Sequence, residues 1–479
     1  MRWLLLVLAL LAGTPSALRA QAEYRVYNDH PRLFLTADRL RRIERDAERR
    51  TARWNRLAAR LEAGDFAEPA FARALAYQAG KREADGRLAV EWALQAAESG
   101  LTEPGELRQA AIVFDWCQPL LSDEERERLA RALADRASAV SQLSGREIAP
   151  VSEGVLAAVA LAGHWEGSEP LLGGFLERQW EQDVLPLLLA GELVDRQRDL
   201  LALIEICHAI RGNLDRDLWR DAPEAFHALP LPRILSYYPD TLESEEGLLR
   251  RPSEWGTGAE APARVAALAR IVEMVLVGYD VASQDFQFLQ GWLRNDSFTL
   301  IGPLGVPYEF LWINPYTPGL SPSSALYVAY DPVRGRLFAR QGWDENSLWA
   351  GYRDGRLQIF SEGEAVEIRP RDQQRPLQFP GGALALANGD GRLTVDAPEA
   401  PARGGAPEAI YVGGLVPGRS YDVKVDKHSA SAYVADRGGL IVIRAAPIGA
   451  DPSIHFDKRV KIQIRAASGG AAPTLTGRR

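Results

Sequence analysis

Residues 111–133 read AIVFDWCQPLLSDEERERLARAL, and this stretch decides the fold of the first half of the chain. Apolar residues recur at helical spacing up to Gln118, and Ser122 then begins a second helix with Glu125 three positions later. A serine N-cap followed by a glutamate at this spacing is a capping box, which marks the start of a helix. The short turn between the two segments predicts an antiparallel helical pair.

The helical pattern extends on both sides of this pair, from about residue 36 to residue 295. Thr36 is the expected N-cap of a long, charged amphipathic helix. Short turns containing Gly or Pro separate the segments, which predicts helices packed in antiparallel pairs. No fixed repeat period is present, so a regular repeat array is disfavoured. Further helices are expected at 68–79, 84–99, 126–143, 152–163, 168–190, 194–212, 260–281 and 284–294.

Residues 229–258 interrupt the helical pattern with several prolines and turn residues. A loop of this length inside a compact domain is uncommon, and such loops often carry function. Two interpretations are open. The stretch is either a functional loop over the helical scaffold or a surface insertion without a role.

After Gly302 the chain changes to short runs of alternating apolar residues between Gly, Asp and Pro. Examples are LWAGYRDGRLQIF at 348–360 and SYDVKVD at 420–426. Runs of this kind are typical of strands in a β-sandwich. The sequences DGR at 354–356 and NGDG at 388–391 predict hairpin turns. The expected fold class is therefore multidomain, α followed by antiparallel β.

The N-terminus has the features of a secretory signal peptide: Arg2, an apolar run from Trp3 to Ala12, and small residues before Glu23. The run is too short to span a bilayer, and no later stretch is apolar enough to do so. The protein is expected to be secreted or periplasmic, without a membrane contact after cleavage. The expected divisions are a signal peptide 1–22, a helical domain 23–300, an interdomain loop 301–324, a β-sandwich 325–468 and a frayed tail 469–479.

Charge and composition limit the partners and cofactors. The formal net charge of −8 disfavours a nucleic-acid partner, because nucleic-acid binding usually needs a basic surface. A local arginine cluster can still bind an acidic polysaccharide. None of the six histidines has a partner at metal-ligand spacing, so neither a metal nor another cofactor is expected. Cys117 and Cys207 lie in apolar helical sequence and are either a disulfide or two buried thiols.

Three segments resemble the heparinase II/III-like polysaccharide lyases and their alginate-lyase relatives. They are HPRLFL at 30–35, ALAYQAGKREADGRLAVEWAL at 74–94, and the stretch at 111–133, where Asp115-Trp116 is the most distinctive part. The resemblance covers residues 28–165 best and GYRDGRLQIFSEG at 351–363 more weakly. It implies an incomplete α/α toroid followed by an antiparallel β-sandwich, and an activity on an acidic, uronate-containing polysaccharide.

A lyase of this kind neutralises the uronate carboxylate, removes the α-proton with a base and protonates the leaving oxygen. The resemblance implies an Asn or His on a toroid helix, a Tyr, and a His from the sandwich. This sequence departs from that pattern. The toroid position reads PVSEG at 150–154, and the sandwich strand reads AGYRDG at 350–355 without histidine. Glu153 is either a polar site residue or an acid near a helix N-terminus.

The remaining candidates are chosen for their chemistry. Tyr238 and Tyr308 are the predicted base or acid, Arg353 is the predicted carboxylate ligand, and Glu153 completes the catalytic set. Aromatic rings, amides and carboxylates are the groups that bind sugars. The predicted substrate-binding residues are Tyr237, His227, Glu309, Trp312, Asn314, Tyr316 and Tyr352. The loop at 305–316 holds several of them and is either a binding loop or an interdomain plug.

Three functions follow from these observations. The first is a divergent lyase that performs β-elimination on, or binds, an acidic polysaccharide or oligosaccharide. The second is a non-catalytic glycan-binding or envelope scaffold protein, which the lost histidines favour. The third is a glycoside hydrolase, which needs two carboxylates roughly 5–10 Å apart. Glu153, Glu309 and Asp354 are the candidates for that pair.

Overall fold

A computed structural model describes residues 24–193, 196–253, 261–276, 278–294, 300–321, 327–368, 376–387, 391–395, 408–445 and 459–467. The predicted signal peptide and the predicted tail lie outside these residues. Contacts divide the chain into two compact units. The first unit holds the described residues up to Thr51, together with Glu68–Leu187 and Ala202–Asp221. The second holds Ala52–Ala67, Leu188–Leu201 and the described residues from Ala222 onwards.

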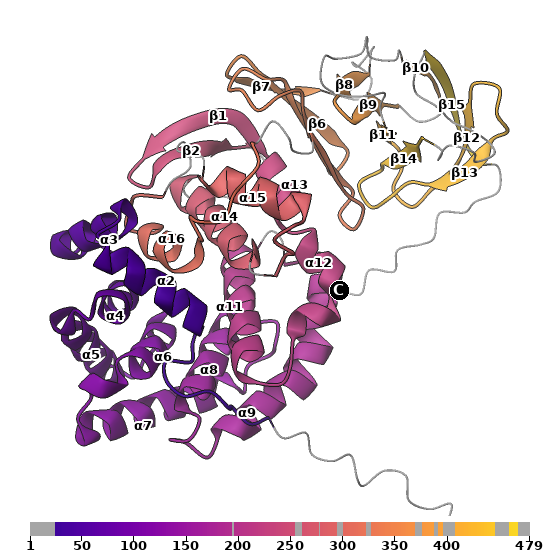
Figure 1. Cartoon of the computed structure of the whole chain (residues 1–479). Helices are drawn as coiled ribbons and strands as arrows, with labels where there is room; N and C mark the ends of the chain where they lie inside the picture. The colour runs from indigo at the N-terminus through magenta and orange to yellow at the C-terminus, as the bar shows by residue number, and fades with distance from the viewer. Residues whose placement is uncertain are drawn as a thin grey trace, which may run out of the picture. The chain divides into compact units, whose positions relative to one another are not determined.

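The first unit is built from helices that pack against their neighbours in sequence (Figure 1). They are α2 (Ala37–Glu48), α4 (Pro69–Gly80), α5 (Glu83–Glu98), α6 (Glu106–Trp116), α7 (Asp123–Val140), α8 (Ile148–Leu161), α9 (Ser168–Gly174), the π-helix η2 (Phe175–Val184) and most of α11 (Gln197–Asn213). The predicted capping box is confirmed: Ser122 Oγ accepts from Glu125 N at 3.3 Å, and Glu125 Oε2 accepts from Ser122 N at 2.9 Å. Thr36 is also confirmed as the N-cap of α2.

Helices α6 and α8 form the centre of this unit. Every residue of α6 after Glu106 is buried, and so is every residue of α8 except Pro150 and Glu153. A helix that is buried on all sides belongs in a core rather than on a surface. Helix α8 accordingly packs against α6, α7 and α9.

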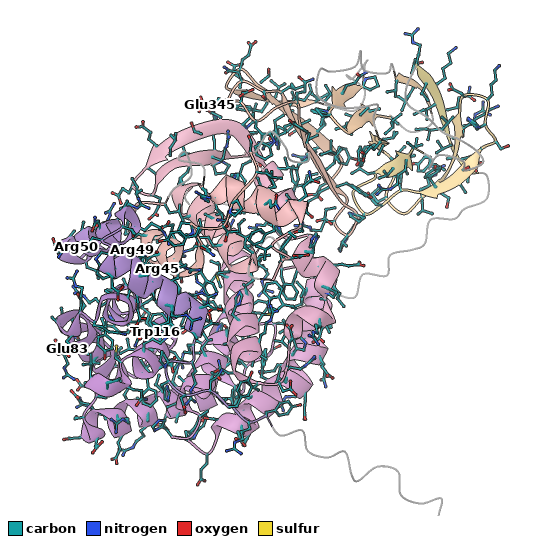
Figure 2. All side chains as sticks on the ribbon, viewed as in Figure 1. Arg45, Arg49, Arg50, Glu83, Trp116 and Glu345 are labelled. Carbon is teal, nitrogen blue, oxygen red and sulfur yellow. The ribbon has the colours of Figure 1, made fainter. Side chains whose placement is uncertain are left out.

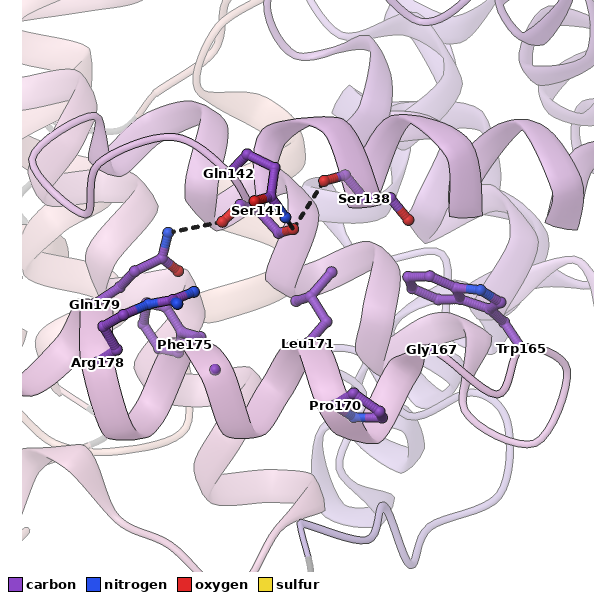
Figure 3. A pocket seen from close by; sticks show the side chains of 11 residues that line it. Ser138, Ser141, Gln142, Trp165, Gly167, Pro170, Leu171, Phe175, Arg178 and Gln179 are labelled. Carbon is purple, nitrogen blue, oxygen red and sulfur yellow. Dashed lines mark hydrogen bonds between the residues drawn. The ribbon is translucent and has the colours of Figure 1, made fainter.

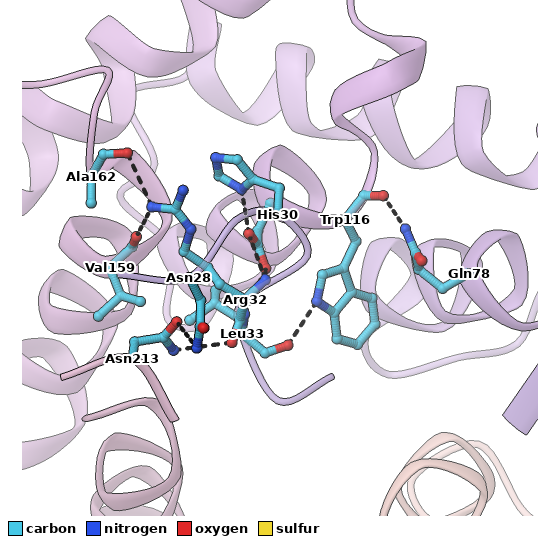
Figure 4. Close-up of polar contacts among 10 residues, drawn as sticks. Asn28, His30, Arg32, Leu33, Gln78, Trp116, Val159, Ala162 and Asn213 are labelled. Carbon is cyan, nitrogen blue, oxygen red and sulfur yellow. Dashed lines mark hydrogen bonds and ion pairs between the residues drawn. The ribbon is translucent and has the colours of Figure 1, made fainter. Parts of the chain in front are cut away.

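Two segments that are far apart in the sequence, HPRLFL and Asp115-Trp116, contact each other (Figure 4). Asp115 is buried and accepts hydrogen bonds from His30 Nδ1, Arg32 N and Leu33 N. The indole N–H of Trp116 donates to Leu33 O at 2.9 Å. The aspartate and tryptophan at the end of α6 therefore fix the extended N-terminal segment to the helical core.

The second unit combines helices with all of the longer strands (Figure 1). Its helices include α3 (Ala52–Ala63), α12 (Pro223–His227), α13 (Pro230–Leu235), α14 (Ala261–Leu276), α15 (Gln284–Arg294) and α16 (Val306–Trp312). The predicted long loop at 229–258 is corrected in part. Residues 230–235 are helical, and β1 (Tyr237–Ser244) pairs with β2 (Gly247–Pro252) in an antiparallel hairpin.

The C-terminal strands form three sheets, which confirms the predicted order of helices followed by antiparallel strands. The five-stranded sheet runs in the order β3 (Val328–Asp331), β4 (Arg336–Arg340), β5 (Trp349–Arg353), β6 (Arg356–Ser361) and β7 (Glu364–Ile368). A middle sheet has the order β14 (Ile441–Arg444), β11 (Ala409–Gly413), β9 (Gly382–Leu386) and β8 (Leu377–Phe379). The last has the order β10 (Gly391–Val395), β15 (Val460–Ala466), β12 (Ser420–Val425) and β13 (Ser431–Val434).

The middle sheet is buried on both faces. One apolar cluster joins it to the last sheet, and a second joins it to the five-stranded sheet. All five residues of β9 and of β11 are buried, and these two strands are parallel to each other. The strands are thus stacked in three layers instead of the two of a simple sandwich.

The two predicted hairpin turns have different outcomes. Asp354 and Gly355 have φ angles of 51° and 78° and join β5 to β6, so this turn is confirmed. The strands on either side of 388–391 belong to different sheets, so that stretch is a connection between sheets and not a hairpin. Its first three residues lie outside the described part of the chain.

Both cysteines are buried free thiols, which decides between the two interpretations of Cys117 and Cys207. Burial raises the pKa of Cys117 to about 12 and the pKa of Cys207 well above its usual value. Among the helices of the described ranges, none has the length and apolarity needed to cross a membrane.

Candidate functional site

The predicted binding loop at 305–316 is mostly helical, which corrects the sequence expectation. Tyr308, Glu309 and Trp312 lie on α16 and are buried. Arg53 Nε donates to Glu309 Oε1 at 2.8 Å, and its Nη2 donates to the carbonyls of Phe310 and Ile313 at the end of the helix. This arginine satisfies the last carbonyls of α16, as helix ends require. The structure therefore gives Glu309 a structural partner.

The residues after α16 form a turn. Asn314 Oδ1 accepts a hydrogen bond from Tyr316 N at 3.1 Å, and Asn314 O accepts one from Gln290 Nε2 at 2.7 Å. Asparagine commonly stabilises a turn in this way. The Tyr316 side chain is exposed. Of the residues predicted in this stretch, Tyr316 is the one most open to a ligand.

Tyr237 and Tyr238 lie on strand β1 and are buried, which corrects their predicted place in a loop. The Tyr238 hydroxyl donates to Gln358 Oε1 at 2.8 Å, and its ring stacks on Phe360 at a centroid distance of 4.2 Å. The Tyr237 carbonyl accepts from Arg340 Nη2 at 2.9 Å. Tyr238 is thus a core residue between the β1–β2 hairpin and the five-stranded sheet.

Tyr352 and Arg353 are consecutive residues of β5, so their side chains point to opposite faces. Tyr352 is fully buried, donates to Gly438 O and accepts from Gly414 N, each at 2.8 Å. Burial raises the pKa of Tyr352 to about 12, so the phenol stays protonated at neutral pH. Arg353 is half-buried and contacts Asp354. The Tyr352 side chain is therefore packed in the core and has no exposed surface for a ligand.

The last two predicted residues, Glu153 in the second turn of α8 and His227 at the end of α12, contact neighbouring helical segments. Glu153 Oε1 accepts from Gly105 N at 3.0 Å, where Gly105 precedes helix α6. His227 is exposed at the end of α12, stacks on Tyr279 at 4.6 Å and lies 3.5 Å from Asp285. Both arrangements hold neighbouring helices together.

The predicted residues do not gather in one place. Glu153 belongs to the first unit and the other ten to the second. Within the second unit, the group on α16 packs against α3 and α14, whereas Tyr352 lies in the core between two sheets. The predicted roles of these residues stay predictions, but the geometry offers no shared cleft to support them.

An open pocket does exist in the first unit, between the end of α7 and the segment α9–η2 (Figure 3). It has a volume of about 260 Å³. Trp165 closes one end and Arg178 lies at the other, with the side chains of Ser138, Gln142 and Leu171 between them.

The backbone around Trp165 is shaped for the indole ring. Trp165 lies in the turn between α8 and α9, and its backbone N–H donates to Leu161 O at 3.0 Å. A Cβ on Gly167 would overlap the indole ring, so only glycine at this position leaves the ring where it is. The ring is half-buried and keeps one face toward the pocket.

The other end of the pocket is carried by the π-helix η2, and π-helical turns occur frequently at functional sites. Gln179 Nε2 donates to Ser141 O at 3.2 Å and to Leu143 O at 2.8 Å, which fixes η2 to the end of α7. Arg178 is exposed and makes no ion pair with any residue of the described ranges. Its guanidinium is therefore available to a ligand.

Sequence reasoning did not find this site. Trp165 follows the end of a helix in HWEGSEP, where a tryptophan beside glycine and serine suggests an exposed ring. Arg178 gives no such signal, because arginine is abundant throughout the chain. The π-helix that presents it has no sequence pattern that distinguishes it from an α-helix.

Comparisons with known proteins add little to this geometry. No family model matches the chain, and no curated protein matches it. Among solved structures, the crystal structure of a mutant of the heparan sulfate lyase HepC from Pedobacter heparinus is similar, with a TM-score of 0.35 and 11% identity. The match covers 83% of this chain and 75% of that chain. A TM-score this low assigns neither a fold nor a function.

Proposed function

We propose that this chain is a secreted glycan-binding protein that binds an acidic sugar residue of a polysaccharide in the pocket between Trp165 and Arg178. The observation that carries the proposal is the pairing of an aromatic ring with an exposed arginine across one concave site. Ligand sites are typically concave, with apolar walls and a few placed polar groups. This pocket is more polar than such sites usually are, which suits a sugar, and its apolar part consists of Trp165, Leu171, Phe175 and Pro170.

The size of the pocket supports a single sugar ring as the bound unit. Its volume of about 260 Å³ lies just below the roughly 300–1,000 Å³ of sites for drug-sized ligands. The hydroxyls of Ser138 and Ser141 and the amide of Gln142 lie along one wall and provide hydrogen bonds to sugar hydroxyls. The rest of the polymer would extend outside the pocket.

Arg178 is the proposed ligand of the sugar carboxylate. The pocket also adjoins the C-terminal end of α7, where the helix dipole disfavours an anion by about 0.3–1 kcal/mol. The dipole fades beyond the last turn, whereas an exposed bidentate arginine–carboxylate pair contributes up to about 1 kcal/mol, so the arginine outweighs the dipole. An acidic sugar is therefore preferred over its neutral counterpart.

The lining favours binding over β-elimination. Elimination needs a base to take the α-proton. The residues that line the pocket, all within the described part of the chain, include no histidine, tyrosine, lysine or carboxylate. None of these lining residues has the chemistry of a general base at neutral pH.

Hydrolysis has no better support from the carboxylates. Glu309 lies near Glu273 in the core of the second unit. Glu309 is 7% exposed and Glu273 is 2% exposed. Burial and the charge of Glu309 raise the pKa of Glu273 well above its usual value. A glycosidic bond cannot reach this pair in the folded protein, so we do not assign it to catalysis.

A polysaccharide panel tests the proposal. The mature protein is run in native gels containing uronate polysaccharides or neutral ones, and the same mixtures are followed for the ultraviolet absorbance of unsaturated uronates. We expect retardation by acidic polymers, loss of retardation in Trp165→Ala, and no absorbance change. Tyr27→Ala, which removes an exposed ring outside the pocket, is the matched control and should behave as wild type. Retardation that survives Trp165→Ala would refute the site, and unsaturated products would refute binding without turnover.

Export is part of the proposal and has its own test. The support is the predicted signal peptide at residues 1–22. Expression of the full chain in a Gram-negative host should yield a periplasmic protein whose N-terminal sequence begins at Glu23. An uncleaved chain retained in the cytoplasm would contradict it.

A further inference from the structure

Arg340 is a fully buried arginine whose charge has little compensation. It ends strand β4, and its side chain reaches under the β1–β2 hairpin, where Nη2 donates to Tyr237 O at 2.9 Å. Its Nε and Nη1 atoms are buried and have no acceptor among the residues that the structure describes. No carboxylate in those ranges forms an ion pair with it.

A second arginine lies close to it. Arg250, on strand β2, is 9% exposed, and its charge is near enough to depress the pKa of Arg340 further below the value that burial alone produces. Two cations beneath one hairpin repel each other unless an anion lies between them or beside them. The Trp343 ring, 4.1 Å from the Arg340 guanidinium, offsets part of the cost by a cation–π contact.

The acidic residues nearby interact with other arginines. Asp240 binds Arg251 at 3.1 Å. Glu345, which Figure 2 labels, accepts from Thr241 Oγ1 at 3.0 Å. Burial lowers the pKa of Arg250, and the charges of Glu345, Asp240 and Asp344 offset part of that shift. The pKa of Arg340 is lowered by burial and by the charge of Arg250, and neither Asp240 nor Glu345 offsets this shift. Arg340 is therefore the member of this group that lacks an anionic partner.

Leaving such a group unpaired is expensive. A buried donor without an acceptor costs about 1–3 kcal/mol, and a buried charge without a partner costs more. The half-buried Trp343 ring, which the guanidinium stacks on, is one of the groups that cover it. An oxyanion that entered beside Trp343 would meet the N–H groups of Arg340 that have no acceptor, at Nε and Nη1.

We propose that the space beneath the β1–β2 hairpin is a binding site for a small oxyanion, held by Arg340 with Arg250 beside it. The chemistry fits an inorganic sulfate or phosphate as well as the carboxylate of a free uronic acid, because each is an anion whose oxygens accept hydrogen bonds from a guanidinium. The site lies in the second unit and uses none of the residues of the Trp165–Arg178 pocket. A bound anion would stabilise the contact between the β1–β2 hairpin and the five-stranded sheet.

Thermal unfolding of the full-length mature protein tests the proposal. Melting temperatures are measured in sodium sulfate, sodium phosphate and sodium glucuronate, each against sodium chloride at equal ionic strength. We expect at least one anion to raise the melting temperature of wild type by about 2–4 °C more than chloride does. The anion that produces the largest shift identifies the source of the oxyanion.

Substitutions separate specific binding from general salt effects, because sulfate and phosphate stabilise many proteins by exclusion from their surfaces. Arg340→Met should keep the chloride melting temperature or raise it, since it removes an unpaired buried charge, and it should abolish the extra shift. Arg356→Met, an exposed arginine on the adjacent sheet surface, should retain the shift. Equal shifts in wild type and Arg340→Met would overturn the proposal.

Two further outcomes are decisive. If Arg340→Met does not fold, the wild-type comparison still decides. The absence of any anion-specific shift in the melting temperature of wild type would overturn the proposal. If glucuronate gives a shift that Arg178→Ala removes and Arg340→Met retains, the anion binds in the first unit and this proposal fails. A shift lost only in Arg340→Met supports it whether or not the glycan proposal holds.

Discussion

At the scale of single residues, side-chain chemistry alone did not identify the candidate site. Tyrosines, a tryptophan and a glutamate with suitable chemistry were predicted at Tyr238, Tyr308, Glu309 and Trp312, and all four are buried. The reason is physical: aromatic rings fill cores as readily as they bind sugars, and a buried glutamate is stable once an arginine such as Arg53 satisfies it. Sequence does not report which of these environments a residue will have.

Asp115 provides a test at this scale, because its carboxylate holds the N-terminal segment through His30, Arg32 and Leu33. Asp115→Ala leaves buried backbone N–H groups without acceptors and should lower the free energy of unfolding of the first unit by about 2–4 kcal/mol. Urea unfolding followed by tryptophan fluorescence measures the change. Asp123→Ala, which removes an exposed partner of Arg126, should cost less than about 1 kcal/mol. Equal costs for the two variants would contradict the role of Asp115.

At the scale of elements, local signals predicted helices well and failed where pairing depends on distant residues. The capping box at Ser122 and the turn at Asp354-Gly355 are both decided by a few adjacent residues, and both are confirmed. The hairpin β1–β2 was missed because Pro239 and a register irregularity between Tyr237 and Thr241 hide the alternation of its strands. Its stability comes instead from packing on the five-stranded sheet, which local sequence does not reveal.

The capping box makes stability depend on pH. Hydrogen bonds from Arg87, and then from the Ser122 backbone, lower the pKa of Glu125 to about 2 from an unfolded value near 4.5. A carboxyl with a depressed folded pKa stabilises the folded state above its unfolded pKa, and this contribution is lost as the pH falls through the folded value. The urea midpoint of wild type should therefore exceed that of Glu125→Gln at pH 7, and the difference should shrink between about pH 4.5 and pH 2.

A neighbouring substitution controls for charge at the helix start. Glu124→Gln changes an exposed acid in the same turn that takes no part in the capping box, and should lower the midpoint at pH 7 by less than Glu125→Gln does. A difference between wild type and Glu125→Gln that is independent of pH would show that the ionised carboxylate does not contribute.

At the scale of the whole molecule, the order of helices followed by strands was predictable, and the layering of the sheets was not. The change of pattern after Gly302 reflects two different periodicities, which any chain of this kind must display. The sequence does contain a sign of the buried middle sheet. GALALA at 382–387 and AIYV at 409–412 are continuously apolar, as expected for strands covered on both faces. Which α-helices pack with the sheets depends on contacts distant in sequence, such as those of α13 with β3 and β4.

Tyr352 tests this layering, because its hydroxyl joins two loops of the β-sheet region at Gly414 and Gly438. Tyr352→Phe removes a buried group that both donates and accepts, and should destabilise the second unit by about 1–3 kcal/mol. Glycan binding should be unchanged, since the residue has no access to a ligand. Calorimetry and gel retardation measure the two effects. A variant with normal stability and impaired glycan binding would restore the predicted substrate role of Tyr352.

The most direct test of the central claim is the affinity of the Trp165–Arg178 pocket for a charged sugar against its neutral counterpart. Isothermal titration of a uronate oligosaccharide and the matching neutral oligosaccharide is performed on wild type and Arg178→Ala. Loss of this exposed charge pair should weaken binding of the uronate by roughly two- to fivefold and leave the neutral ligand unaffected. Arg131→Ala, an exposed arginine of α7 outside the pocket, should match wild type. Equal uronate affinities for wild type and Arg178→Ala, or no binding by wild type, would contradict the account.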